Sequence, residues 1–298
     1  MDRIEAMRVF VRIVERESFA QAARDLQIPR PTATNAIKQL ETALGTRLLE
    51  RTTRHVRPTL DGEAYYERCV RLLADLDEAE STFRNASPRG PLRVDMQGTL
   101  ARFFVLPALP RFIARYPGIA LRLSEGDRMV DMIQEGVDCV LRAGELKDSS
   151  LIGRRVASFE QVTCASPDYL ARFGVPQSLD DLAGHQMVAY ASSAAGQAYP
   201  LEFREQDQLR LVPLPHEVTV SGAEIYTASA VAGLGLIQVP LYRVRHQLEA
   251  DVLRLVLPHH PPPPMPVSVL YPHNRHLSPR VRVFVDWLGE IFAEAAKP

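Results

Sequence analysis

The feature that most constrains the fold is the stretch 18–41, SFAQAARDLQIPRPTATNAIKQLE, where two short helical patterns flank Pro29 and Pro31. Proline lacks the amide hydrogen that an interior helical turn needs, so the first pattern must end before Pro29. Two helices joined by so short a turn cross at a steep angle, and the start of the second helix protrudes. The stretch therefore predicts a helix-turn-helix.

Apolar residues at helical spacing predict three helices here, the first over residues 3–16, the second from 18 to about 26 and the third from about 30 to 44. Ser18 with Gln21 is typical of a capping box, and Gly45 of a helix end. The positions that we expect to be buried are Ile4, Met7, Phe10, Val11, Val14, Phe19, Ala22, Ala23, Leu26, Ala33, Ile37, Leu40 and Leu44.

The opposite face of the third predicted helix is polar and basic, with Arg30, Thr34, Asn35 and Lys38. In a helix-turn-helix, the first residues of the second motif helix contact base edges in the DNA major groove. Residues 1–60 carry 11 Lys and Arg against 7 Asp and Glu, whereas the rest carries 24 against 29. This modest asymmetry favours a basic head that meets a polyanion, although by itself it also fits an ordinary charged surface.

The segment 48–59, LLERTTRHVRPT, predicts a basic hairpin with arginines at positions 51, 54 and 57. Such a wing can follow phosphates and reach the minor groove. Residues 61–86 then read as one long helix that needs a partner helix to cover its apolar stripe. After the breaker SPRGP at 87–91, strand and helix patterns alternate, which predicts a mostly parallel α/β sheet. We therefore expect domains at 1–60, 61–87 and 88–298.

Several protein classes are disfavoured. There is no apolar run of about 18 residues and no secretory signal at the N-terminus, so we expect a cytoplasmic protein without a membrane span. GxSxG, HExxH and Walker sequences are absent, and GLG at 233–235 fits a helix-to-strand turn better than a nucleotide fingerprint. Cys139 and Cys164 read as buried thiols rather than a redox pair.

No cofactor or metal is expected, because four candidate histidines lack regular ligand spacing. They are His259, His260, His273 and His276.

Several motifs occur in one order along the chain: SFAQAA, QLETALGTRLLERT and PTLDGE, then GPLRVDMQGTLARFFVLPALPRFIARYPGIALRL, CASPDYL, AVAGLGLIQVP and HLSPRVRVFVDWL. With them, nearly the whole chain resembles the LysR-type transcriptional regulators. The resemblance implies a winged helix-turn-helix, a dimerising linker helix and a two-lobed effector domain like periplasmic solute-binding proteins. Lobe I would hold 91–161 and 268–298, and lobe II 162–267, with the return crossing at 261–264.

The resemblance also implies partners: double-stranded promoter DNA, a small-molecule effector such as an organic anion or small aromatic acid, and further copies of the chain in a dimer or tetramer. It assigns base contacts to Arg30, Pro31, Thr34 and Asn35. The remaining DNA-contact candidates, for phosphates and the minor groove, are Thr32, Lys38, Arg51, Thr53 and Arg54.

The sequence departs from the family pattern at three positions. Gln27 stands where a turn glycine is usual, which predicts a strained turn. Pro29 stands where a side-chain cap is common, and Asn35 where a longer polar side chain is frequent, so the base preference is the open point.

An effector cleft is expected where strands of an open α/β sheet end. Thr99, after the first strand of lobe I, is the leading candidate because a hydroxyl beside the amides of a helix start suits a carboxylate. Arg142, Ser221 and Gln238 also follow strands, and for these an ordinary surface role is equally open. The alternative to a regulator is a solute-binding or enzymatic α/β protein whose first 86 residues only oligomerise. The missing signal and the missing catalytic constellation argue against it.

Overall fold

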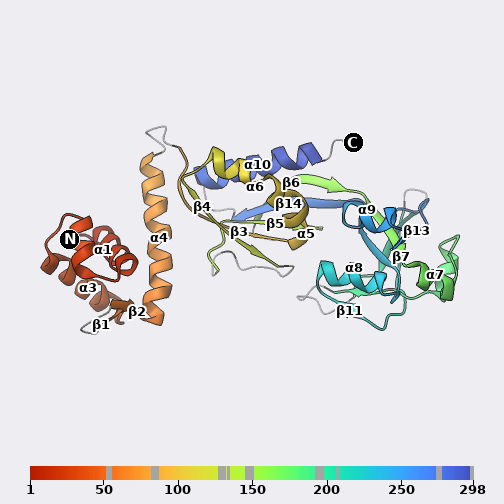
Figure 1. Ribbon diagram of the computed structural model, residues 1–298, viewed down its shortest axis with the longest axis horizontal. Helices are drawn as coiled ribbons and strands as arrows, with labels where there is room; N and C mark the ends of the chain where they lie inside the picture. Colours follow the sequence, from red (N-terminus) through yellow and green to blue (C-terminus); the bar gives the residue numbers. More distant parts are fainter. Residues whose placement is uncertain are drawn as a thin grey trace. The chain divides into compact units, whose positions relative to one another are not determined.

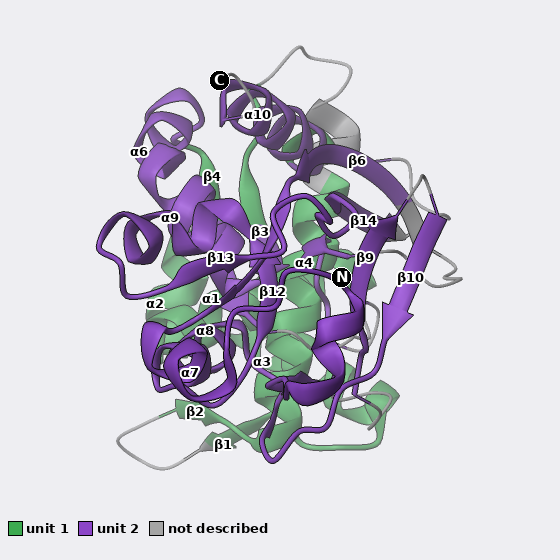
Figure 2. Cartoon of the chain, turned by 90° about the vertical axis from the view of Figure 1, so that its right-hand side faces the viewer, with its two compact units in different colours: residues 1–91, 118–120, 278–280 green, residues 92–117, 121–277, 281–298 purple. Residues whose placement is uncertain are grey.

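The computed structural model describes residues 1–51, 56–81, 87–126, 132, 135–144, 151–191, 198–205, 208–272 and 277–295 (Figure 1). These group into two compact units, coloured separately in Figure 2. Unit 1 consists of residues 1–91, 118–120 and 278–280, and unit 2 of 92–117, 121–277 and 281–298.

Unit 1 begins with the three predicted helices, α1 (Arg3–Arg16), α2 (Phe19–Asp25) and α3 (Arg30–Leu44). A short antiparallel pair follows, β1 (Leu49–Arg51) and β2 (Val56–Pro58), in which Leu49 lies opposite Pro58. The long helix α4 (Leu60–Ser81) follows β2. The helix-turn-helix is thus confirmed, and so is the long helix as far as Ser81, whereas its predicted end at residue 86 lies outside the described residues.

The buried face of α1 differs from the predicted stripe. Ala6, Val9, Phe10 and Ile13 are buried, whereas Ile4 is 42% exposed. The reason is that α1 contacts α2, α3 and α4 together, so its buried face is set by three neighbours rather than by the most apolar stripe. Leu44, at the end of α3, is also more exposed than expected.

The helix caps follow the sequence only in part. Ser18 Oγ accepts a hydrogen bond from Gln21 N at 3.3 Å, which is one half of the predicted capping box. A complete capping box lies instead at α1, between Asp2 and Glu5, where the sequence analysis did not anticipate it. Gly45 ends α3 in the left-handed region with φ 70°, as predicted.

Unit 2 contains a five-stranded sheet in the order β4-β3-β5-β14-β6. Its strands are β3 (Gly90–Met96), β4 (Ile119–Glu125), β5 (Cys139–Ala143), β6 (Leu151–Phe159) and β14 (Met265–Pro272). Strands β3 and β5 are parallel, but β14 runs antiparallel to both β5 and β6. The expectation of a mostly parallel sheet is wrong. Strand β14 lies between β5 and β6 and runs antiparallel to both of them.

A second group of strands follows β6. Strand β7 (Gln161–Ala165) lies between β12 (Ile237–Pro240) and β13 (Arg254–Val256), antiparallel to both. Parallel β8 (Ala189–Tyr190) and β11 (Thr219–Val220) and the hairpin β9 (Leu201–Glu205) and β10 (Gln208–Val212) accompany it. The helices of unit 2 are α5 (Gly98–Leu100), a π-helical segment (Ala101–Val105), α6 (Leu106–Arg115), α7 (Pro167–Phe173), a 3₁₀ segment (Asp180–Gly184), α8 (Ala223–Val231), α9 (Leu241–Glu249) and α10 (Pro279–Ala295).

The last helix, α10, has Val281, Phe284, Val285, Leu288 and Phe292 buried. None of the described helices combines the length and the apolar character that a membrane crossing requires.

Candidate functional site

The turn between α2 and α3 is tight and strained. Gln27 has φ 54°, in the left-handed region that favours glycine, which confirms the strain expected there. Its amide donates to Arg24 O at 3.1 Å, and the Ile28 amide donates to Ala23 O at 3.0 Å. Pro29 then precedes α3 in an extended conformation and supplies no side-chain cap, also as expected.

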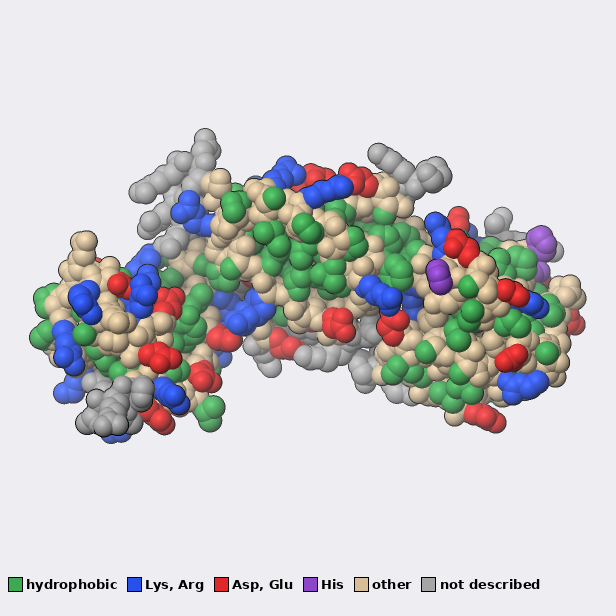
Figure 3. All heavy atoms as spheres, in the orientation of Figure 1, with side chains coloured by type: hydrophobic (Ala, Val, Ile, Leu, Met, Phe, Trp, Pro, Cys, Tyr) green, Lys and Arg blue, Asp and Glu red, His purple; other side chains and the backbone are tan. Residues whose placement is uncertain are grey.

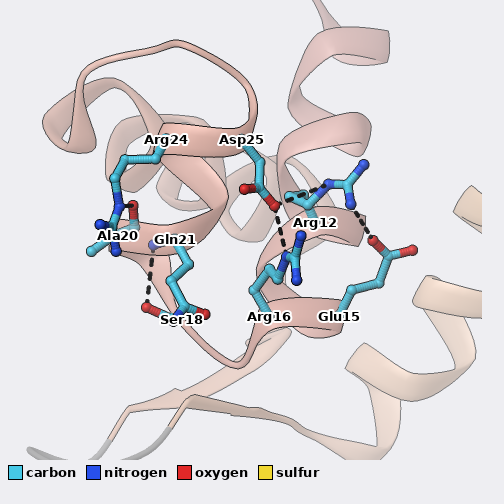
Figure 4. A network of polar contacts seen from close by, with 8 residues as sticks. All are labelled: Arg12, Glu15, Arg16, Ser18, Ala20, Gln21, Arg24 and Asp25. Atoms are coloured by element: carbon cyan, nitrogen blue, oxygen red, sulfur yellow. Dashed lines mark hydrogen bonds and ion pairs between the residues drawn. The ribbon is translucent and has the colours of Figure 1, made fainter.

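A set of ion pairs joins α1 to α2 (Figure 4). Arg16 Nε lies 2.7 Å from Asp25 Oδ2, and Arg12 Nε lies 3.9 Å from the same oxygen. These side chains are 30–50% exposed, so each pair is worth at most about 1 kcal/mol. Their contribution is to hold the first motif helix against α1, which in turn sets the direction of α3.

Helix α3 has one buried and one open face. Ala33, Ala36, Ile37 and Leu40 are buried, and the alanines let neighbouring helices approach closely. On the other face Arg30, Pro31, Asn35 and Lys38 are exposed, and Thr32 and Thr34 are half-buried. Thr34 Oγ1 donates to Arg30 O at 3.1 Å. The exposed amide, guanidinium and ammonium groups are of the kinds that bind base edges and phosphates.

The wing is described only at its base. Arg57 on β2 is exposed, whereas the side chain of Arg51 and all of Thr53 and Arg54 lie outside the described residues. Glu41 Oε1 accepts from Leu48 N at 3.0 Å and from Leu49 N at 3.2 Å, so α3 holds the first wing strand directly. The sequence pattern does not single out Glu41, because a polar side chain on α3 resembles any surface position.

Two of the effector candidates lie at one end of the five-stranded sheet. Thr99, in α5, is 2% exposed, and its side chain is hydrogen-bonded to that of Tyr242. Arg142, on β5, forms an ion pair with the buried Asp95 of β3, and Asp95 Oδ2 also accepts from Ser124 Oγ at 2.7 Å. Gln97 N donates to Leu141 O at 3.1 Å and so ties the start of α5 to β5.

The other two candidates belong to other elements of unit 2. The Gln238 side chain accepts from Glu202 N at 2.8 Å and donates to Glu202 O and Thr163 Oγ1, so its amide joins β12 to β7 and β9. Ser221 is exposed before α8, and its carbonyl accepts from Tyr190 Oη at 3.2 Å. Helix α8 contacts α5, and Glu224 in its first turn pairs with Arg102 at 3.2 Å, so the start of α8 lies near the helical segment that contains Thr99.

A group on α9 was missed by the sequence analysis. The Arg243 guanidinium donates to Ala223 O and, at 2.7 Å, to Thr227 Oγ1, which holds the first turns of α8. Burial lowers the pKa of Arg243, while nearby tyrosines and Glu224 oppose that shift. Burial raises the pKa of its neighbour Tyr242, and the hydrogen bond with Thr99 opposes that effect. No local pattern could reveal these contacts, because they join residues at least 16 positions apart.

The cysteines are buried, as expected. Burial raises the pKa of Cys164 to about 12 and raises the pKa of Cys139 strongly, so both stay protonated and unreactive at neutral pH. Within the described ranges, no cluster of three or more His, Cys, Asp and Glu could hold a metal ion. His273 and His276 lie outside the described residues.

Comparison with known proteins gives consistent matches along the chain. A family described as "Bacterial regulatory helix-turn-helix protein, lysR family" matches residues 4–63, and one described as "LysR substrate binding domain" matches residues 85–293. The HTH-type transcriptional regulator YhjC of Escherichia coli is 39% identical over 296 residues, which cover 99% of both chains. An HTH-type transcriptional repressor of Pseudomonas aeruginosa is 38% identical over 99% of this chain and 93% of its own.

Among solved structures, the LysR-type regulator CrgA of Neisseria meningitidis matches with a TM-score of 0.60 and 31% identity, covering 98% of this chain and 99% of its own. The family matches cover both the helix-turn-helix and the α/β part, in the same order as the structure shows them. The chain therefore belongs to the LysR-type transcriptional regulators, DNA-binding proteins with an N-terminal winged helix-turn-helix and a C-terminal effector-binding domain.

Proposed function

We propose that this regulator reads its operator through the exposed face of α3, with Arg30, Pro31, Thr34 and Asn35 at base edges. The single observation that carries this proposal is the division of α3 into a buried alanine-rich face and an exposed polar face that begins at the motif turn. Arg30 can bridge guanine O6 and N7, and Asn35 can pair with adenine N6 and N7. Thr32, Lys38, Arg51 and Thr53 contact phosphates, and Arg54 enters the minor groove.

The protein acts as a homodimer, and two dimers form a tetramer on the promoter. Exposed apolar side chains support an association of copies: Leu60 is 87% and Leu72 55% exposed on α4. In unit 2, Leu106 and Ile113 on α6 and Ile225 on α8 are each at least 50% exposed, and Figure 3 shows apolar side chains gathered over α5 and α6. A symmetric dimer presents two α3 helices to an interrupted palindrome.

The effector is a small organic anion that binds where the five-stranded sheet meets α5 and α8, near Thr99, Arg142 and Ser221. Gln97 gives the start of α5 no side-chain cap. At this end of the sheet Arg102 pairs with Glu224 and Arg142 pairs with Asp95, and a bound anion can replace either carboxylate. The ligand acts by binding one arrangement of the assembly more tightly than another. No catalytic step is involved, and the protein works in the cytoplasm.

Fluorescence anisotropy tests the DNA proposal, using the full chain, a duplex from upstream of its own gene and a scrambled competitor over a salt series. We expect binding that survives the competitor and weakens steeply with salt. The double variant Arg30→Ala, Arg54→Ala should lose the preference for the upstream duplex. If it binds that duplex as well as the unmodified protein does, the assignment of these residues is wrong.

The effector proposal is tested by thermal unfolding with a panel of carboxylates, amines and neutral aromatic compounds. We expect only carboxylates to raise the unfolding temperature. Thr99→Val, which keeps the shape of the side chain and removes its hydroxyl, should abolish that rise. An unchanged rise in this variant would remove Thr99 from the site.

A further inference from the structure

One charged side chain at the start of α10 is almost completely buried. The Arg280 side chain is 3% exposed, and its Nη2 donates to Asp75 Oδ1 at 2.6 Å. Asp75 belongs to α4, the helix that follows the DNA-binding motif, and its side chain is 43% exposed. A buried guanidinium needs an acceptor, because removing it from water without one is costly. The contact therefore ties the first turn of α10 to α4.

The division of the chain into two compact units agrees with this contact. Residues 278–280 belong to unit 1, whereas residues 281–295 of the same helix belong to unit 2. The stretches 90–91 and 118–120 also belong to unit 1, and Gly90 N donates to Gly118 O at 2.9 Å. A side chain built at Gly90 would meet Ala74 Cβ at 3.4 Å, next to Asp75. Three separate segments of the α/β chain thus gather at the second half of α4.

The rest of α10 is fixed in unit 2. Phe284 packs edge-on against Phe112 of α6 with ring centroids 5.2 Å apart. Phe292 packs against Phe104, which follows α5, at 5.1 Å. Phe104 in turn contacts Tyr242 at 4.8 Å, and Tyr242 is hydrogen-bonded to Thr99. A continuous series of packed side chains therefore runs from the candidate effector site to the helix whose first turn is held by Asp75.

We propose that the Asp75–Arg280 ion pair couples the effector domain to the DNA-binding head, by holding the first turn of α10 and the second half of α4 as one piece. The proposal rests on the proposed function, because DNA binding at α3 is the event that the pair transmits. Coupling between two sites is reciprocal in free energy. If DNA binding stabilises one position of α10 through this pair, then holding α10 in that position raises the affinity for DNA by the same free energy.

Hydrogen exchange of the full chain, without DNA or effector, tests the contact itself. Asp75→Asn keeps the shape of the side chain and removes its charge, and we expect roughly tenfold faster exchange in residues 280–284, as fits a lost hydrogen bond to a charged group. Arg280→Lys keeps the positive charge and should speed exchange in residues 72–76 of α4. Unchanged exchange in both segments would overturn the proposal.

A second Arg–Asp pair, between Arg154 of β6 and Asp286 of α10, provides the control. Arg154 Nη1 lies 2.6 Å from Asp286 Oδ1, with side chains 48% and 54% exposed, and both residues belong to unit 2. We expect Asp286→Asn and Arg154→Lys to leave exchange in residues 72–76 unchanged. If they speed it as much as Arg280→Lys does, the effect is not specific to the Asp75–Arg280 contact and the proposal fails.

The same experiment with bound upstream duplex tests transmission. We expect DNA to slow exchange in residues 280–284 of the unmodified protein, and expect no such effect in Asp75→Asn although that variant still binds DNA. DNA that binds without altering residues 280–284 would overturn the coupling and leave the DNA-binding proposal intact. Failure of the duplex to bind would instead count against the proposed DNA contacts, while exchange in the free protein still decides the ion pair.

Discussion

At the scale of single residues, Gln27 carries backbone strain in the turn before α3. A side chain in the left-handed region costs roughly 1 kcal/mol that glycine does not incur. Gln27 is exposed, and the hydrogen bond of its amide to Arg24 O does not involve the side chain. We therefore expect Gln27→Gly to raise the free energy of unfolding of unit 1 by about 0.5–1 kcal/mol, measured by denaturant titration.

The matched control is the same substitution within α3. Gln39 is exposed in the middle of that helix, so Gln39→Gly should lower the free energy of unfolding by about 1 kcal/mol. A loss of stability in both variants would mean that Gln27 makes a contribution that outweighs its backbone strain.

His185 gives a prediction on pH. It is 5% exposed, and its Nδ1 lies 3.1 Å from the Tyr169 hydroxyl. Burial lowers the pKa of His185, and the nearby Asp181 carboxylate opposes this shift. The unfolded chain therefore binds a proton that the folded chain excludes, so stability is complete above about pH 6.5 and falls as the pH drops below that value.

The measurement is the unfolding midpoint between pH 7.5 and 5. In His185→Gln the decline over this range should be smaller than in the unmodified protein. His246→Gln, at an exposed position of α9, should keep the full decline. Asp181 does not interfere, because its lowered pKa places its contribution at more acidic pH. Equal declines in all three proteins would exclude His185 as the cause.

At the scale of elements, α3 separates two kinds of DNA contact. Lys38→Ala should weaken binding to all duplexes alike and reduce the slope of log affinity against log salt by about 1. Arg30→Ala should instead cost about 1–3 kcal/mol on the operator alone and relax the preference at one base pair. The measurement is anisotropy on the upstream duplex and on single-base variants of it.

The opposite result would be as informative. If Arg30→Ala weakens all duplexes equally, Arg30 contacts phosphate, and the base contacts must come from other residues of α3 or from the wing.

The elements themselves were largely predictable, because helix boundaries are local. Pro29 and Gly45 delimit α3 by their own backbone preferences, and the structure begins and ends that helix beside them. The face that α1 buries and the antiparallel return of β14 were not predictable, since both depend on neighbours distant in sequence. Arg243 and Arg280 escaped notice for the same reason: their partners lie 16–20 and 205 residues away.

At the scale of the whole molecule, the exposed leucines of α4 predict how copies associate. Leu72 is 55% exposed on a helix in which Cys69 and Leu73 are buried in unit 1. In a dimer formed through α4, Leu72 of each copy is covered, and burying one leucine contributes about 1.5–3 kcal/mol. Leu72→Glu should therefore shift the protein toward monomer in sedimentation velocity at micromolar concentration.

Loss of the dimer should weaken DNA binding. A monomer contacts one half-site, so Leu72→Glu should bind a duplex carrying two half-sites no more tightly than a duplex carrying one. The control is Leu255→Glu on β13, a position that is 45% exposed in unit 2, where we expect both the dimer and the advantage of two half-sites to remain. A dimer that persists in Leu72→Glu and is lost in Leu255→Glu would show that copies associate through unit 2 and that α4 only connects the head to it.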